Sequence, residues 1–236
     1  MRNRFNYIML FALLAVAASS CKKDNYAPPS STLSGKIVYK GEAIGVEYNQ
    51  VPIQIYQYGF GLVAPINTSV AQDGSYSALL FDGDYKFIIP NGQGPFRWRY
   101  TSSGAPDSVA ISMKGSQTMD MEVTPYYMIR TPQIAVTGGK VTGTFKAEKI
   151  ITDANAKNIE RVNLYINKTQ FVSGNADQNI GKAEIGGSAV TDPNNISMTV
   201  SIPSIVPTQN YVFARLGIKI AGVEDMILSQ VVKLTF

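Results

Sequence analysis

The chain has 236 residues, of which 21 are Lys or Arg, 17 are Asp or Glu and none is His. Its one cysteine is Cys21, so no intramolecular disulfide can form and packing alone must hold the fold. This composition excludes Cys/His zinc sites and catalysis that depends on histidine. Arg2, Arg4, Lys22 and Lys23 supply much of the positive excess and precede the part expected to fold. We therefore expect no basic stripe and no nucleic-acid partner.

The first two dozen residues have the pattern of an export signal. A basic start precedes an apolar run from residue 7 to 18, which has the length of a signal-peptide core and is too short to span a bilayer. Small residues then lead to Cys21, in a pattern that resembles a bacterial lipoprotein processing site. We expect a signal peptide over residues 1–20 and a lipidated Pro/Ser-rich tether over residues 21–32, with acyl chains on Cys21. The alternative is a free thiol behind an ordinary secretion signal.

The residues directly after the cysteine carry a further resemblance. Lys22, Lys23 and Asp24 are similar, in part, to the tag that sends lipoproteins of the Bacteroidota to the cell surface. This resemblance implies a lipid-anchored protein in the outer membrane that faces the cell exterior.

Strand signals dominate from Leu33 onward. The clearest is the alternation in residues 51–58, where Val51, Ile53 and Ile55 would share one face. The Asp-Gly pair ending at Gly74 predicts a tight turn. We expect strands over residues 33–39, 51–58, 67–71, 75–80, 85–89, 109–113 and 119–123.

The pattern of glycines and tyrosines in this region resembles a carboxypeptidase-regulatory-like domain. It consists of Leu33-x-Gly35-x-Ile37, then Asp73-Gly74-x-Tyr76, then Leu79/Leu80-x-x-Gly83-x-Tyr85. The resemblance implies a small β-sandwich of transthyretin-like (prealbumin-like) topology over residues 33–125, serving as a scaffold and not as a catalytic site. Independently, Gly74 can supply a positive φ, and Tyr76 and Tyr85 are expected to point inward.

A second strand-rich region follows two Thr-Pro pairs, at residues 124–125 and 131–132, that mark the expected joint. Strands are predicted over residues 134–136, 140–148, 161–167, 196–202, 211–220 and 227–236, and a short helical turn within 153–161. Several short strands with polar turns are typical of an immunoglobulin-like or fibronectin-like sandwich, here over residues 126–236. The fold class is therefore all-β, with two tandem sandwiches.

The chain as a whole resembles one family. The resemblance rests on the lipoprotein-like start, the two expected sandwiches and the run from Leu79 through the segment GQGPF (92–96). It is a Bacteroidota family of surface lipoproteins defined by a domain of unknown function. Its members are typically encoded beside starch-utilisation-system-like pairs of a TonB-dependent transporter and its surface lipoprotein. The resemblance implies this pair as partners, and nutrient capture, most often of glycans and in some cases of peptides, as the role.

The segment GPFRWRY holds the only tryptophan of the chain, Trp98. In a strand, Phe96, Trp98 and Tyr100 would share one face, and Arg97 and Arg99 the other. Aromatic rings stack on sugars and guanidinium groups donate to hydroxyls, so Arg97, Trp98, Arg99 and Tyr100 are the predicted ligand-binding residues. The alternative is that the aromatic rings belong to the core or the domain joint and the arginines are solvated.

Two further aromatic residues, Tyr58 and Phe60, lie on a glycine-flanked loop that could close over a ligand. The alternative there is an ordinary hairpin tip. The turn carboxylates do not form the converging pair that a glycosidase needs, so we predict no catalytic residue, cofactor or metal site. Oxygen atoms in the turns near residues 175–179 or 192–195 could coordinate calcium, but neither segment has the ligand spacing of a known calcium-binding loop.

The sequence thus predicts a non-catalytic cell-surface lipoprotein that acts as the accessory glycan-binding component of a polysaccharide uptake system. One alternative is a structural adaptor that contacts the outer-membrane transporter complex without binding ligand. Another is a surface adhesin or fimbria-type subunit.

Overall fold

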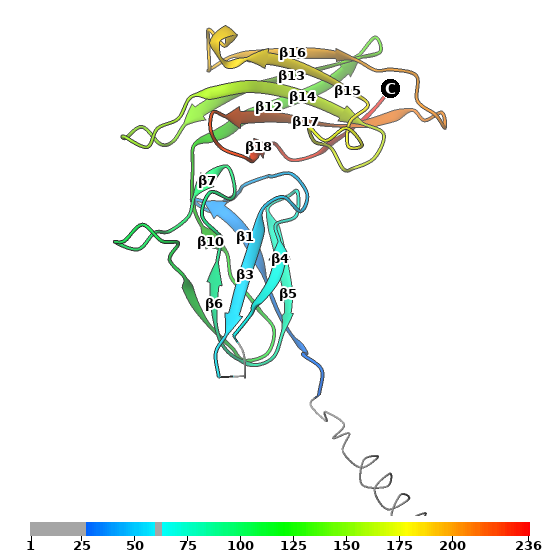
Figure 1. Cartoon of the computed structure of the whole chain (residues 1–236). Helices are drawn as coiled ribbons and strands as arrows, with labels where there is room; N and C mark the ends of the chain where they lie inside the picture. The colour runs from blue at the N-terminus through cyan, green and yellow to red at the C-terminus, as the bar shows by residue number, and fades with distance from the viewer. Residues whose placement is uncertain (1–26, 60–62) are drawn as a thin grey trace, which may run out of the picture.

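The computed structural model describes residues 27–59 and 63–236, which form two β-sandwich domains (Figure 1). The predicted signal peptide, Cys21 with the first half of the predicted tether (residues 21–26), and Phe60 lie outside the described residues. Within the described ranges no helix is long and apolar enough to cross a membrane. The prediction of an all-β chain with two sandwiches is confirmed.

The first domain contains β1 (Ser31–Tyr39), β2 (Glu42–Ala43), β3 (Pro52–Gln57), β4 (Pro65–Ser69), β5 (Ser75–Leu80), β6 (Gly83–Ile88), β7 (Phe96–Arg97), β8 (Val109–Met113), β9 (Gln117–Thr118), β10 (Met121–Glu122) and β11 (Thr124–Pro125). One sheet has the order β4-β3-β6-β8, and the other is built around β1, which pairs with β2, β5, β9 and β10. A small ribbon joins β7 to β11.

The alternation predicted for β3 places its apolar side chains in the core of this domain. Val51, Ile53 and Ile55 are fully buried, and Tyr76 and Tyr85 point inward as expected. The buried hydroxyl of Tyr76 donates to the Met119 carbonyl, and that of Tyr85 to the Phe81 carbonyl. Each tyrosine therefore adds apolar packing without leaving a polar atom unpaired.

The turn before β5 depends on glycine. Gly74 has a φ of +88°, and a Cβ there would lie 2.5 Å from the Ile44 carbonyl oxygen. An L-residue would meet both a backbone penalty and a clash at this position. The predicted role of Gly74 is confirmed.

The second domain contains β12 (Tyr127–Thr137), β13 (Lys140–Lys149), β14 (Ile159–Asn167), β15 (Gly181–Gly186), the single turn η1 (Gly187–Ala189), β16 (Ile196–Ser201), β17 (Tyr211–Ile220), β18 (Met226–Leu228) and β19 (Val232–Thr235). One sheet has the order β12-β13-β16. The other has the order β15-β14-β17-β18, with β19 also paired to β17. This is the two-sheet arrangement expected of an immunoglobulin-like or fibronectin-like sandwich.

Two local predictions for this domain are wrong, and one strand was missed. Residues 153–155 form a bend and a turn and residues 156–158 an irregular segment, without a helix, and β14 begins at Ile159. The expected final strand 227–236 is two strands, since residues 229–231 separate β18 from β19. β15 was not predicted: its residues alternate, but the strand is short and has only Ala183 and Ile185 as apolar residues between two glycines.

The outer face of β14 is buried, although it points away from the sandwich of the second domain. Asn163, Tyr165 and Asn167 alternate with an apolar row and would face water on an exposed sheet, yet all three are buried. Figure 1 shows the first domain against this side of the second, with β18 between them. The second domain itself supplies most of this cover: Tyr165 packs with Val172 and with Met226 of β18, and the Asn167 side-chain amide donates to the Phe171 carbonyl.

Arg215 of β17 lies at the centre of the junction between the two domains and is 0% exposed. Its Nη1 and Nη2 donate to the carbonyls of Val46 and Gln72 in the first domain, at 3.1 and 2.7 Å. Its Nε donates to the Ser229 carbonyl at 2.7 Å. Burial lowers the pKa of Arg215 to about 10, so the side chain remains charged at neutral pH. One cation thus joins the backbones of both domains.

Candidate functional site

The segment that carries the predicted ligand residues is held between the domains. The Gly94 N–H donates to the buried carboxylate of Asp225, in the second domain, at 2.6 Å. Gly94 has a φ of +81°, and a Cβ there would lie within 2.3 Å of the Phe96 ring. β7 then pairs with β11, with Arg97 opposite Thr124. These contacts fix the backbone that presents Arg97.

Trp98 is not available as a stacking platform for a sugar, which corrects the prediction made from its neighbours. Its side chain is 4% exposed, and its indole N–H donates to the Asp107 carbonyl at 2.7 Å. Its ring lies 5.9 Å from that of Phe87 in the core. Phe96 is buried as well. The alternative interpretation, that these aromatic rings are core residues, therefore holds for Trp98 and Phe96.

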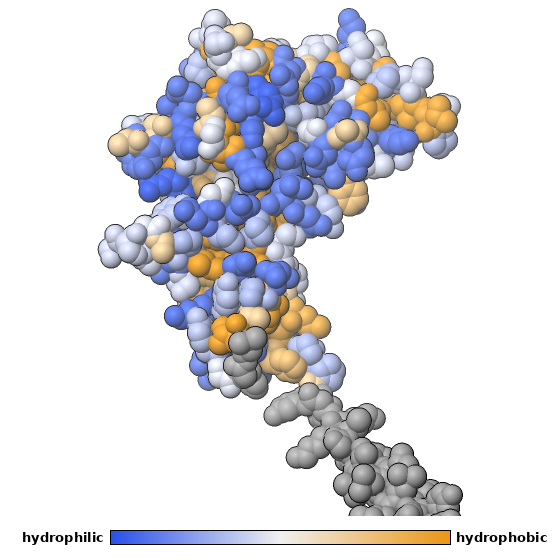
Figure 2. Space-filling view, viewed as in Figure 1, coloured by the Kyte–Doolittle hydropathy of each residue, from blue (hydrophilic) through white to orange (hydrophobic). Residues whose placement is uncertain are grey.

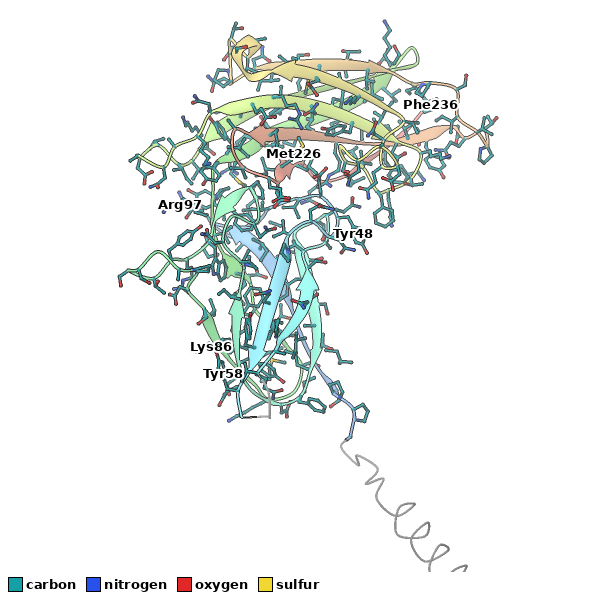
Figure 3. The ribbon with its side chains drawn as sticks, viewed as in Figure 1. Tyr48, Tyr58, Lys86, Arg97, Met226 and Phe236 are labelled. Carbon is teal, nitrogen blue, oxygen red and sulfur yellow. The ribbon has the colours of Figure 1, made fainter. Side chains whose placement is uncertain are left out.

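Arg97 and Tyr100 border a groove of about 520 Å³ at the side of the domain junction. The first domain contributes these two residues, Thr124 and a small part of Trp98, and the second contributes residues 150–153. Figure 3 shows Arg97 at the boundary between the domains. The groove exists only because the two domains are docked.

The groups in this groove are charged and aromatic. The Arg97 guanidinium lies 5.7 Å from the centre of the Tyr100 ring. The backbone N–H and side-chain amide of Asn155 lower the pKa of Asp153, and the charge of Arg97 lowers it further. Burial raises the pKa of the neighbouring Tyr126. At neutral pH the groove thus offers a guanidinium, a carboxylate, a phenol and threonine hydroxyls, which is a set of donors and acceptors suited to a polyhydroxylated ligand.

The other predicted ligand residues lie elsewhere. Arg99 is exposed next to the groove but does not line it. Tyr58 is exposed at the far end of the first domain, with the Lys86 ammonium 5.3 Å from its ring centre, and Figure 3 shows this pair well away from Arg97. The structure therefore does not bring Tyr58 to the groove.

Sequence reasoning missed the contribution of the second domain. Asp153 lies in a turn, and nothing in the local sequence places it beside Arg97. Thr124 and Thr152 carry no signal that would distinguish them from other turn residues. Among the residues that the structure describes, no three His, Cys, Asp or Glu side chains are grouped so that they could hold a metal ion.

Comparison with protein families accounts for nearly all of the described chain. The model "Protein of unknown function (DUF3823) N-terminal domain" matches residues 31–124, and the DUF3823 C-terminal domain matches residues 127–233. The chain belongs to the DUF3823 family. Comparison with curated proteins gave no match.

Solved structures of other DUF3823 proteins share this architecture. A family member from Parabacteroides merdae is 31% identical, with a TM-score of 0.75 over 89% of this chain and 100% of that one. One from Bacteroides ovatus is 30% identical, with a TM-score of 0.73 over 88% and 99%. A Bacteroides uniformis protein named "putative carbohydrate binding protein" is 18% identical, with a TM-score of 0.67 over 88% and 100%, and at that identity it shows the fold alone.

Proposed function

We propose that this DUF3823 protein is a non-catalytic, lipid-anchored cell-surface protein that binds carbohydrate in the groove between its two domains. The observation that carries the proposal is the meeting of Arg97 and Tyr100, from one domain, with Asp153, from the other, around one polar groove. The carbohydrate-binding name of the Bacteroides uniformis relative supports the same ligand class.

Arg97 and Asp153 would act as the hydrogen-bonding pair of the site. A sugar hydroxyl both donates and accepts, so adjacent hydroxyls can bridge a guanidinium and a carboxylate without leaving either group unpaired. Arg97 already lies over the Tyr100 ring, which limits the rotamers that it samples before a ligand arrives. A ligand would therefore meet side chains that are partly ordered, which reduces the entropy lost on binding.

The test is a binding screen with a matched pair of arginine variants. Affinity gel electrophoresis against soluble plant and host-mucin polysaccharides identifies a ligand for the wild-type protein, and calorimetry then measures the variants. Arg97→Ala and Asp153→Asn should each weaken binding about 10-fold or more, as expected for one charged hydrogen bond. Arg99→Ala removes a neighbouring arginine outside the groove and should change the dissociation constant less than about 2-fold. Equal effects of Arg97→Ala and Arg99→Ala would contradict the assignment of the groove.

We propose further that the acyl chains on Cys21 anchor the protein in the outer membrane, facing the exterior, beside a TonB-dependent transporter and its surface lipoprotein. Labelling with a clickable palmitate analogue should mark the wild-type chain but not Cys21→Ser. Protease treatment of intact cells should remove it. Co-purification with the transporter pair, together with no retardation by any glycan, would instead support the structural adaptor.

A further inference from the structure

The end of the first domain that points away from the second carries a concentration of exposed apolar side chains. Five large hydrophobic residues lie there: Tyr58, Val63, Ile66, Leu79 and Phe81. We call this set the distal apolar patch. Leu79 and Tyr58 are 58% and 54% exposed, and Phe81 is 42% exposed. Figure 2 shows apolar residues gathered at this end of the molecule.

Strand pairing brings several members of the patch together. The Thr68 hydroxyl of β4 donates to the Ser77 carbonyl of β5, so the two strands run side by side. Two residues further toward the distal end, Ile66 and Leu79 occupy neighbouring positions, and both are exposed. Ile66, Leu79 and Phe81 thus lie together at the distal ends of two neighbouring strands, rather than as a scatter of single exposed residues.

The chain enters the first domain at the same end. Ser31, the first residue of β1, pairs with Leu80 at the end of β5, and its hydroxyl donates to Asp82 at 2.5 Å. Cys21 precedes Ser31 by ten residues. A chain of that length reaches about 35 Å when fully extended and less in any other conformation, so an acyl anchor on Cys21 would hold the patch close to the bilayer.

The charges near the patch favour apolar over electrostatic contact. Among the described residues at this end, Lys86 and Lys114 are offset by Asp82 and Asp84, so positive and negative charges balance there. The Asp82 carboxylate is also engaged, accepting from the Ser31 hydroxyl and the Gly115 N–H. The Lys86 ammonium lies beside the Tyr58 ring. An aromatic ring next to a cationic side chain is a combination typical of residues at the membrane interface.

We propose that the distal apolar patch docks on the lipid surface, with its side chains in the headgroup region of the bilayer that holds the acyl chains. The inference rests on the lipid anchor proposed above and is independent of the carbohydrate site. Docking would give the anchored protein a defined orientation, with the patch on the membrane and the interdomain groove at the side of the molecule above it. Because apolar burial drives the contact, salt should affect it little.

A single introduced cysteine tests this proposal, since Cys21 is the only native thiol and is acylated in the anchored protein. Leu79→Cys and, as a control in the second domain, Ser201→Cys are labelled with an environment-sensitive fluorophore. Both residues are exposed in β-strands, so neither substitution should disturb the core. The full lipidated chain is reconstituted on phosphatidylethanolamine/phosphatidylglycerol vesicles that carry a headgroup-depth nitroxide quencher.

The label at position 79 should be quenched at least about 3-fold more than the label at 201, and this difference should persist at 0.5 M salt. Adding Ile66→Lys should abolish most of it while leaving the melting temperature unchanged. Equal quenching at the two positions, in protein that floats with the vesicles, would overturn the docking but not the anchor. Protein that does not float would overturn both. Protection of position 79 in native outer membranes but not on vesicles would assign the patch to a protein partner and overturn the lipid contact.

Discussion

Replacing Arg215 by methionine should remove the main polar connection between the two domains. Methionine keeps much of the length of the arginine side chain but donates no hydrogen bond. It leaves the carbonyl oxygens of Val46, Gln72 and Ser229 without the donor that each now has within 3.1 Å, and those of Val46 and Ser229 are buried. The substitution therefore isolates the polar contribution from a loss of packing.

The size of the effect follows from these contacts. Each orphaned buried acceptor costs about 1–3 kcal/mol. Part of that loss is offset, because burying the charged guanidinium of the wild-type protein costs desolvation energy and no carboxylate is in direct contact with it. The methionine variant avoids this cost. We expect a net loss of about 3 kcal/mol in the free energy of unfolding. Arg215→Lys keeps the charge but lacks the planar guanidinium with its several N–H donors. This variant should lose about 2 kcal/mol in the free energy of unfolding.

Urea unfolding followed by two probes distinguishes a loss of stability from a loss of coupling. Trp98 is the only tryptophan and lies in the core of the first domain, so its fluorescence reports that domain, whereas far-ultraviolet circular dichroism reports both. The two transitions should coincide in the wild-type protein and separate in Arg215→Met. A loss below about 1 kcal/mol with coincident transitions would refute the central role of Arg215 in the junction.

Two further substitutions probe the buried polar and aromatic contacts near the groove. Burial raises the pKa of Asp225 above its ordinary value of 3.8. Its stabilising contribution is therefore full below that ordinary value and is lost as pH rises through the folded-state pKa. The wild-type protein should lose stability relative to Asp225→Asn between pH 3 and 7, and a difference that does not change with pH would contradict this account. Trp98→Ala should cost about 3–5 kcal/mol in thermal unfolding, as expected for a buried aromatic residue, and a cost near zero would mean that the ring is not core.

Local sequence patterns were enough to predict most of the strands and their inward faces. In β3 and the residue before it, the alternation of Val51, Ile53 and Ile55 with other residues indicates which side chains are buried, because side chains in a strand alternate between two faces. The same reasoning placed Tyr76 and Tyr85 in the core and assigned the turn to Gly74. These features depend on residues close together in sequence, so local patterns suffice to predict them.

The cover of the outer face of β14 and the residues that form the groove depend on contacts between segments far apart in the sequence. Alternation assigns Asn163 and Tyr165 to an outer face, but only the folded chain shows that β18 and the segment with Val172 cover Tyr165. Docking of the two domains gives Arg215 its partners Val46 and Gln72 and places Asp153 near Arg97, whereas Trp98 is buried within the first domain. Such long-range contacts are set by shape and by the pairing of buried polar groups across domains, which no periodicity in the sequence encodes.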